Sequence, residues 1–162
     1  MKVLALDPSL SSTGYAILNE NKELIDKGKI NTSPKYSTDD RILKIITILD
    51  EFSGIDVVVL EDGFVGFNAR GSLKLAELRG AIIFFHKYNC KEVIHMQPKE
   101  IRKKFGLKGS AKKDEVAERV LEYYPYLESE IGPYSDKANK DKTSDIYDAI
   151  SIGLSYIINL EE

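Results

Sequence analysis

The sequence of 162 residues contains one cysteine, two histidines and no tryptophan. A single cysteine, Cys90, excludes an internal disulfide bond and a metal cluster built from several cysteines. The chain shows neither a charged-then-apolar leader at its start nor an apolar run long enough to span a bilayer. We therefore expect a single domain over residues 1–162 that works in the reducing cytoplasm, away from membranes.

The net charge is also small, at −3, which by itself argues against a nucleic-acid partner. The charge is unevenly distributed, however, because the segment 99–113 carries a single acid, Glu100, among many cations. Its basic residues are Lys99, Arg102, Lys103, Lys104, Lys108, Lys112 and Lys113. Such a segment is typical either of a solvated helix face or of a surface that binds nucleic acid.

The hydrophobic pattern predicts an α/β fold with one mixed, five-stranded sheet. Strands are expected at residues 3–7, 14–18, 23–31, 55–61 and 93–96, and helices at residues 40–52, 69–88, 98–105, 112–123 and 143–159. Thr38 or Asp39 is expected to cap the first helix, and residues 125–142 are expected to form a polar loop. Short turns between the first three strands predict an antiparallel meander, and the later crossovers predict parallel neighbours.

Two of the expected buried strands end in a carboxylate, Asp7 and Glu61. Asp145 and Asp148 are three residues apart on the last expected helix, so they share a face. If that helix packs on the sheet, four carboxylates meet, and a divalent cation relieves their mutual repulsion. Ligation by oxygen alone favours Mg²⁺ or Mn²⁺ over zinc, and two such ions about 4 Å apart support phosphodiester hydrolysis.

Some of these carboxylates also have a purely structural explanation. Asp7 precedes a Pro-Ser turn and is suited to capping it. Asp145 is expected near the start of a helix, where an acid is favourable. This explanation is weaker for Asp148, which lies almost one turn further along and is followed by two apolar residues.

Five motifs resemble, in order and spacing, those of the RuvC Holliday junction resolvases. They are LALDPSLSSTGYAIL, VVVLEDGF, SLKLAELRGAII, GLKGSAKKDEV and SDIYDAISIGL, and the resemblance covers nearly the whole chain except residues 128–142. It implies a ribonuclease H-like fold and a dimeric, Mg²⁺-dependent endonuclease with two ions per active site, for which Mn²⁺ substitutes. It also implies that Asp7, Glu61, Asp145 and Asp148 are the metal-binding and catalytic acids.

The resemblance assigns further residues to catalysis and to DNA binding. Lys113, in the GSAKK loop, matches the family's active-site lysine near the scissile phosphate, and Phe64 matches the aromatic residue that meets bases at the junction centre. Arg102 stands where a second functional lysine is usual, which keeps the charge but changes the geometry. Ser9 replaces the usual glycine, as expected of a diverged, phage-type member. The other cations expected to contact DNA are Lys103, Lys104, Lys108 and Lys112.

These observations predict a structure-selective endonuclease that resolves four-way DNA junctions by paired, metal-dependent hydrolysis. The alternatives are a phosphoryl-transfer enzyme of the actin and sugar-kinase type, a broader branched-DNA or RNA-processing nuclease of the same fold, and a non-catalytic DNA-binding module. A phosphoryl-transfer enzyme of the actin and sugar-kinase type needs a duplicated domain. In a non-catalytic DNA-binding module, the four acids would repel DNA unless metal were bound. The apolar helix segment 73–85, which contains Gly80, is either core or the seam of a homodimer.

Overall fold

The computed structural model describes residues 1–62, 68–89, 91–134 and 137–161, without the side chains of residues 138, 139 and 141. In this part of the chain, five strands form one sheet in the order β3-β2-β1-β4-β5: β1 (Lys2–Asp7), β2 (Ser12–Asn19), β3 (Leu24–Asn31), β4 (Val57–Glu61) and β5 (Glu92–Met96). β2 pairs antiparallel with β1 and β3, whereas β4 pairs parallel with β1 and β5. The predicted mixed sheet is confirmed.

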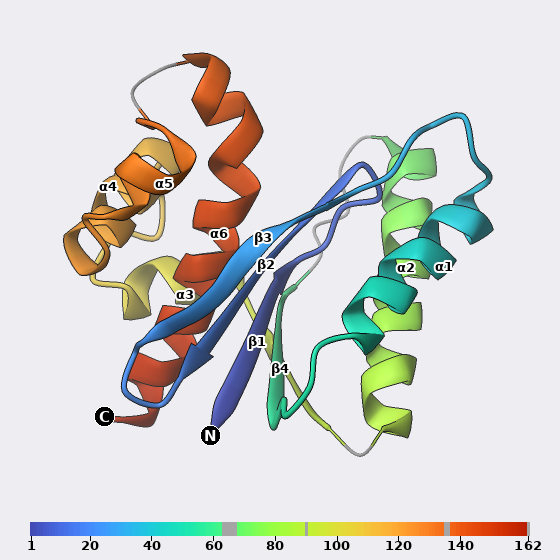
Figure 1. The fold of residues 1–162 in the computed structure, drawn as a ribbon, viewed down its shortest axis with the longest axis horizontal. Coiled ribbons are helices and arrows are strands. Elements are labelled where there is room, and N and C mark those ends of the chain that lie inside the picture. The colour runs from blue at the N-terminus through green and yellow to red at the C-terminus, as the bar shows by residue number, and fades with distance from the viewer. Residues whose placement is uncertain (63–67, 90, 135–136, 162) are drawn as a thin grey trace.

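Helices cover both faces of this sheet (Figure 1). One face carries α1 (Thr38–Asp50) and α2 (Ala69–Tyr88). On the other side are α3 (Pro98–Lys104), α4 (Lys113–Tyr123), α5 (Leu127–Ile131) and α6 (Lys137–Leu160). None of the helices that the structure describes is both long and apolar enough to cross a membrane.

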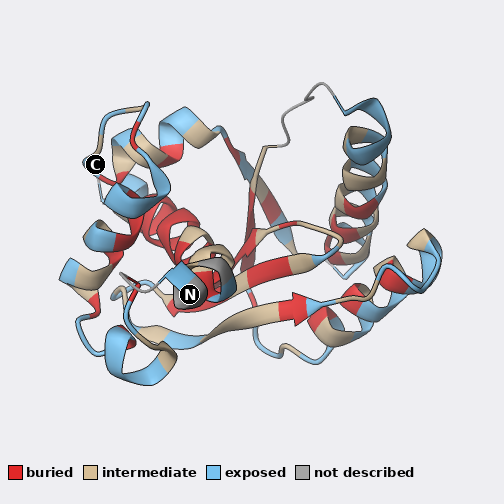
Figure 2. Cartoon of the chain, turned by 90° about the horizontal axis from the view of Figure 1, so that it is seen from above, coloured by how far each residue is buried: buried red, intermediate tan, exposed pale blue. Residues whose placement is uncertain are grey.

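The central strand β1 explains why the core has two layers. Side chains alternate along a strand, so Val3 and Ala5 join the apolar cluster under α3, α4 and α6, whereas Leu4 and Leu6 join the cluster under α1 and α2. All four are fully buried, as expected for a strand in a sheet that is covered on both faces. Figure 2 shows the buried residues between the layers and the exposed residues on the outer surfaces of the helices.

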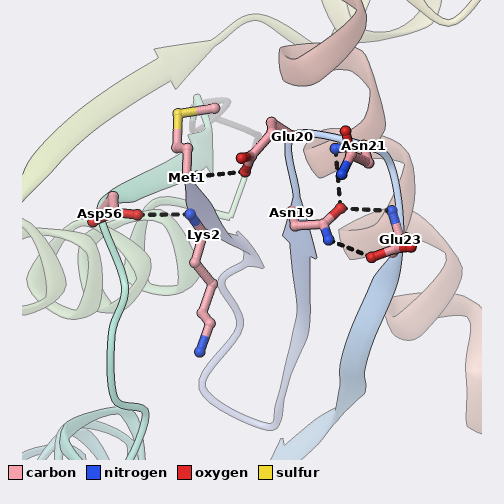
Figure 3. Close-up of polar contacts among 7 residues, drawn as sticks. All are labelled: Met1, Lys2, Asn19, Glu20, Asn21, Glu23 and Asp56. Carbon is pink, nitrogen blue, oxygen red and sulfur yellow. Dashed lines mark hydrogen bonds and ion pairs between the residues drawn. The ribbon is translucent and has the colours of Figure 1, made fainter.

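Polar contacts fix the end of the sheet at which β1 begins (Figure 3). The backbone N–H of Lys2 donates to Asp56 Oδ2 at 2.7 Å, which ties β1 to the entry of β4. In the turn between β2 and β3, Asn19 Oδ1 accepts from the backbone N–H groups of Asn21 and Glu23, each at 3.0 Å. These contacts hold the strands in register at one end, and the predicted site lies at the other.

Two glycines let α6 approach the sheet closely. Gly153 of α6 faces β1 and β2, and a Cβ built on it would lie 3.1 Å from the Cβ of Ala5 and would overlap Leu18. Further toward the start of the helix, a Cβ on Gly14 of β2 would overlap the backbone carbonyl of Asp145. Because glycine has no side chain, the helix backbone rests directly on the sheet at both positions.

The structure corrects the prediction for residues 125–142. This segment is not a continuous loop: α5 lies within it, and α6 begins at Lys137 rather than at residue 143. Gly132, which has a φ of +87°, ends α5. The residues that predicted a loop therefore interrupt the helical structure only between α5 and α6. Residues 137–142 have no apolar periodicity, yet they belong to α6, and Lys137 and Lys142 are exposed in this part of the helix.

The first helix also starts differently from the prediction. Ser37, rather than Thr38 or Asp39, is the cap of α1, and its Oγ accepts from the backbone N–H of Asp40 at 3.1 Å. The remaining boundaries agree with the prediction within two residues.

We expect Gly14→Ala to destabilise the fold by about 1–3 kcal/mol, because the added methyl group displaces the backbone of α6 from β2. Gly109→Ala is the matched control, since its Cβ would meet neighbouring side chains at an ordinary 3.7 Å. Chemical denaturation of both variants measures the difference. Equal stability of the two would show that α6 does not depend on this close approach.

Candidate active site at the carboxyl ends of β1 and β4

Asp7 and Glu61 reach the same edge of the sheet because β1 and β4 are parallel neighbours. Leu6 pairs with Leu60 in the register of the two strands, so the next residue on each strand is a carboxylate. Both carboxylates belong to half-buried residues at the strand ends. The predicted convergence of the two strand ends is therefore present.

Asp145 and Asp148 come to this edge on α6. Gly14 pairs with Asp7 across β1 and β2, and the Asp145 backbone lies directly over Gly14, so the helix is placed beside Asp7. Since α6 begins at Lys137, Asp145 lies in its third turn. A role for Asp145 at a helix N-terminus therefore no longer explains its position.

The electrostatics show that the four carboxyl groups form one cluster. Burial raises the pKa of Asp7 to about 8, and the negative charges of Asp148, Glu61 and Asp145 add to this effect. Burial and the charge of Asp148 likewise raise the pKa of Glu61. Burial, with a smaller contribution from Asp145, also raises the pKa of Asp148. In the absence of a cation, this cluster therefore retains protons that isolated carboxylates would lose.

Lys113, the first residue of α4, offsets part of this negative charge. Its Nζ donates to Asp148 Oδ2 at 2.5 Å. Burial opposes the charge of the ammonium group, but the attraction of Asp148 and of Asp7 outweighs it, and the pKa of Lys113 is raised. The amine is therefore held as a cation beside Asp148.

The carboxylates do not converge as a finished metal cage. Within the described residues, no group of three or more His, Cys, Asp or Glu side chains is close enough together to hold a metal ion. The donor chemistry nevertheless fits Mg²⁺ or Mn²⁺, because the four acids offer only carboxylate oxygens, the ligands that these hard cations prefer. Within the protein itself, the ammonium group of Lys113 balances the charge of Asp148.

Arg102 and the neighbouring lysines of α3 form a basic surface beside this cluster. The charge of Arg102 lowers the pKa of both Glu61 and Asp148, so its guanidinium lies within electrostatic range of the site. Its Nη1 donates to the carbonyl of Pro98 at 3.1 Å, whereas its buried Nε has no hydrogen-bond partner. Arg102, Lys103 and Lys104 line a cavity of about 900 Å³ next to the site.

The other predicted DNA-binding residues are distributed differently. Lys108 and Lys112 are exposed in the connection between α3 and α4, close in sequence to Lys113, and they do not line that cavity. Phe64 lies outside the described residues. The structure therefore brings Arg102 and Lys113 to the carboxylates and leaves Lys103, Lys108 and Lys112 as exposed cations nearby.

Sequence reasoning missed a polar network behind Glu61. Arg79 of α2 donates to the backbone carbonyl of Glu61, and its Nη2 lies 3.3 Å from Asp62 Oδ1. Asp62 also accepts from Gln97 at 2.6 Å and lies 3.3 Å from His95 Nδ1. The only sequence signal was an acid next to Glu61 and an arginine in the SLKLAELRG motif. This network holds the end of β4 against α2 and β5.

Comparison with known proteins finds relatives that match nearly the whole chain. The family model described as crossover junction endodeoxyribonuclease RuvC matches residues 3–155. The RuvC protein of Ehrlichia chaffeensis is 33% identical over 129 residues, covering 75% of this chain and 83% of its own. The RuvC protein of Campylobacter jejuni is 31% identical over 166 residues, covering 99% and 98%.

Solved structures show the same fold. A Thermus thermophilus RuvC in complex with a Holliday junction substrate superposes with a TM-score of 0.76 at 20% identity, covering 99% of this chain and 95% of that one. The fowlpox virus resolvase, in a complex with substrate Holliday junction DNA, gives a TM-score of 0.69 at 22% identity over the full length of both chains. The ribonuclease H-like architecture predicted from the sequence is thus confirmed, and the chain belongs to the RuvC family of crossover junction endodeoxyribonucleases.

Proposed function

We propose that this protein resolves four-way DNA junctions by nicking two strands symmetrically, and that Asp7, Glu61, Asp145 and Asp148 carry the metal ions of the reaction. The observation that carries the proposal is the cluster of carboxylates from two adjacent strand ends and one helix, in which burial and neighbouring negative charges raise the pKa of Asp7, Glu61 and Asp148. Membership of the RuvC family supports the choice of a phosphodiester as the bond that is cut.

The four acids would hold two Mg²⁺ ions, with Mn²⁺ as a substitute. Such ions activate a water molecule and stabilise the leaving oxygen of a phosphodiester. Asp148 is positioned by its ion pair with Lys113, and Glu61 is positioned by the strand end that Arg79 holds. Ion binding must displace the proton that Asp7 retains up to a pH of about 8.

The cations around the acids account for binding of the DNA backbone. Lys113, which pairs with Asp148 in the protein, would donate to the scissile phosphate if Asp148 held a metal ion. Arg102 lines the cavity of about 900 Å³ beside the acids and would contact a phosphate that enters it. The remaining proposed contacts are Lys103, Lys104, Lys108 and Lys112 on α3 and in the connection to α4.

Phe64 completes the proposed site on the strength of the sequence alone, as the ring that stacks on unpaired bases at the junction centre. It follows Glu61 by three residues, so the ring that would open the base pair lies close in sequence to an acid that would position the phosphate. We further propose that residues 1–162 act as one domain in the cytoplasm, which agrees with a single cysteine and a DNA substrate.

A homodimer would provide the second active site that paired nicks require. The outer face of α2 supports this proposal because it exposes apolar side chains in helical register. Leu73 is 62% exposed, Phe84 is 71% exposed and Tyr88 is 77% exposed, while Gly80 has no heavy atom within 4 Å of a Cβ built on it. Exposed apolar surface of this kind is typical of a protein interface.

The first test of the function uses synthetic four-way, three-way and duplex DNA. We expect paired nicks in the four-way junction with Mg²⁺ or Mn²⁺ and no cleavage in EDTA. Glu61→Gln and Asp145→Asn should reduce cleavage to background and leave junction binding intact, because fewer negative charges then face the phosphates. Nicks mapped at nucleotide resolution and binding titrations decide between the outcomes. Loss of binding in step with cleavage would make these acids structural, and equal cleavage of all three DNAs would favour a broader branched-DNA nuclease of the same fold.

The second test separates Lys113 from the other cations. Lys113→Ala should slow cleavage by roughly 10²–10³-fold with little change in affinity, since its ammonium meets charge that develops on the phosphate. Lys103→Ala and Lys108→Ala should mainly weaken binding and flatten its dependence on salt. Single-turnover rates and affinities at several salt concentrations provide the comparison. Small and equal effects at all three positions would show that the basic segment is only a solvated surface.

The third test follows pH. The pKa of Asp7 is higher in the folded protein than in the unfolded chain, so the native state binds the additional proton. In EDTA, the free energy of unfolding should therefore fall as pH rises from about 4 to about 8. Asp7→Asn should reduce this fall and make the apoprotein about 1–3 kcal/mol more stable at pH 8. Denaturation at several pH values measures both effects.

Metal ions should oppose this loss of stability at high pH in the wild-type protein. Because Mg²⁺ or Mn²⁺ competes with the proton on Asp7, the rise in melting temperature at a fixed metal concentration should be larger at pH 8.5 than at pH 6. Asp7→Asn should show a much smaller rise at either pH. A rise that does not depend on pH, or that survives in Asp7→Asn, would place the metal elsewhere.

The fourth test concerns assembly. Phe84→Glu places a charge on the exposed face of α2 and should convert a dimer to a monomer that no longer makes paired nicks. Ile25→Glu is the matched control, because Ile25 is a 51% exposed apolar residue on β3. Sedimentation velocity reports the assembly state. A wild-type monomer that still makes paired nicks would overturn the proposal.

A further inference from the structure

Arg41 of α1 is a buried cation that lacks a carboxylate partner. Only 8% of the residue is exposed. Its Nε donates to Thr32 Oγ1 at 2.7 Å and its Nη2 to Ser11 Oγ at 3.3 Å, so its hydrogen bonds go to neutral hydroxyl groups. No ion pair to Arg41 exists in the part of the chain that the structure describes. A buried charge without a counter-charge is unfavourable, which indicates that an anion completes its surroundings.

A cavity of about 320 Å³ lies next to this guanidinium. Its lining includes Arg41 and Lys74, the turn of residues 8–11 that directly follows Asp7, and Gly71 and Leu75 at the start of α2. The described lining contains two cationic side chains, serine hydroxyls and no acid. It is therefore suited to a small anion with several oxygen atoms.

The wall of the cavity is rigidly connected to the predicted active site. Thr13, which is fully buried, donates through its Oγ1 to the carbonyl of Ser9 at 2.7 Å. Thr32 Oγ1 donates to the carbonyl of Leu10 and also accepts from Arg41. Figure 1 shows the connection from β1 to β2 extending toward the first turn of α2. An anion bound to Arg41 would thus contact the turn that continues from Asp7.

We propose that this cavity binds a backbone phosphate of the DNA strand that is being cut, with Arg41 as its main ligand and Lys74 as the second. The inference rests on the proposed function. The cavity lies on the α1–α2 side of Asp7, whereas the basic residues of α3 and α4 lie on the opposite side of the sheet. A strand whose scissile phosphate reaches the acids would then be held on both sides.

The experiment compares Arg41→Gln and Lys74→Ala with Lys44→Ala as the matched control. Lys44 lies almost one turn further along α1, is exposed, and donates only to the carbonyl of Asn31 at 2.9 Å. Binding of a four-way junction is measured in Ca²⁺ over a range of salt concentrations. A second series of junctions carries one neutral methylphosphonate at a time around the cleavage site, and each is tested against each variant.

We expect Arg41→Gln to weaken junction binding about tenfold and to lower the salt slope by about 0.9, the value for one phosphate contact. One methylphosphonate should weaken binding of the wild type and have no further effect on Arg41→Gln, because both changes remove the same contact. Lys74→Ala should show a weaker form of the same behaviour, and Lys44→Ala should match the wild type. Additive effects at every phosphate would overturn the proposal.

Thermal unfolding separates this role from a structural one. If Arg41→Gln lowers the melting temperature while the folded fraction binds every junction like the wild type, Arg41 serves only to hold the turn and the proposal is wrong. Inorganic phosphate, with chloride at equal ionic strength as the control, tests whether the cavity takes free phosphate. If the wild type fails to bind any junction, the proposed function fails. In that case, a rise in melting temperature with phosphate that Arg41→Gln abolishes would still support an anion site in the cavity. If phosphate causes no such rise, the anion site itself is overturned.

Discussion

The partial burial of like charges at the carboxyl ends of β1 and β4 is the constraint on which the rest of this structure depends. Asp7 ends a strand that is covered on both faces, and its pKa is raised to about 8 mainly because water is excluded. Asp148 and Glu61 add their charges to the same region. Clustered negative charges of this kind oppose folding at neutral pH, and a divalent cation bound by the carboxylates would relieve their repulsion, as proposed for this site.

The surrounding elements compensate for these charges and fix their positions. Lys113 comes from α4, Arg102 from α3 and Arg79 from α2, and each lowers the pKa of at least one of the clustered acids. The contact between Gly14 and the backbone of Asp145 places α6 over the strands. Helices on both faces of the sheet therefore contribute to one edge, and a change in the packing of α6 acts directly on the site.

The sequence predicted the features that depend on local pattern. Short turns, later crossovers and strand-terminal carboxylates were sufficient to predict the antiparallel meander, the parallel neighbours and the meeting of Asp7 with Glu61. The start of α6 was not predictable, because residues 137–142 lack the apolar spacing by which a helix is recognised. The roles of Arg79 and Arg41 depend on contacts with residues that lie 9, 18 and 30 positions away in the sequence, so no local pattern around them indicated a partner.

The central claim is that Asp7, Glu61, Asp145 and Asp148 together bind the catalytic metal ions. The most direct test is anomalous diffraction at low temperature from crystals of a protein–junction complex grown with Mn²⁺. The protein in the complex is either the wild type or the Asp145→Glu variant. We predict two anomalous peaks in contact with these carboxylates and next to a DNA phosphate. Saturating Mn²⁺ that supports cleavage in solution but gives no peak among these side chains would contradict the account.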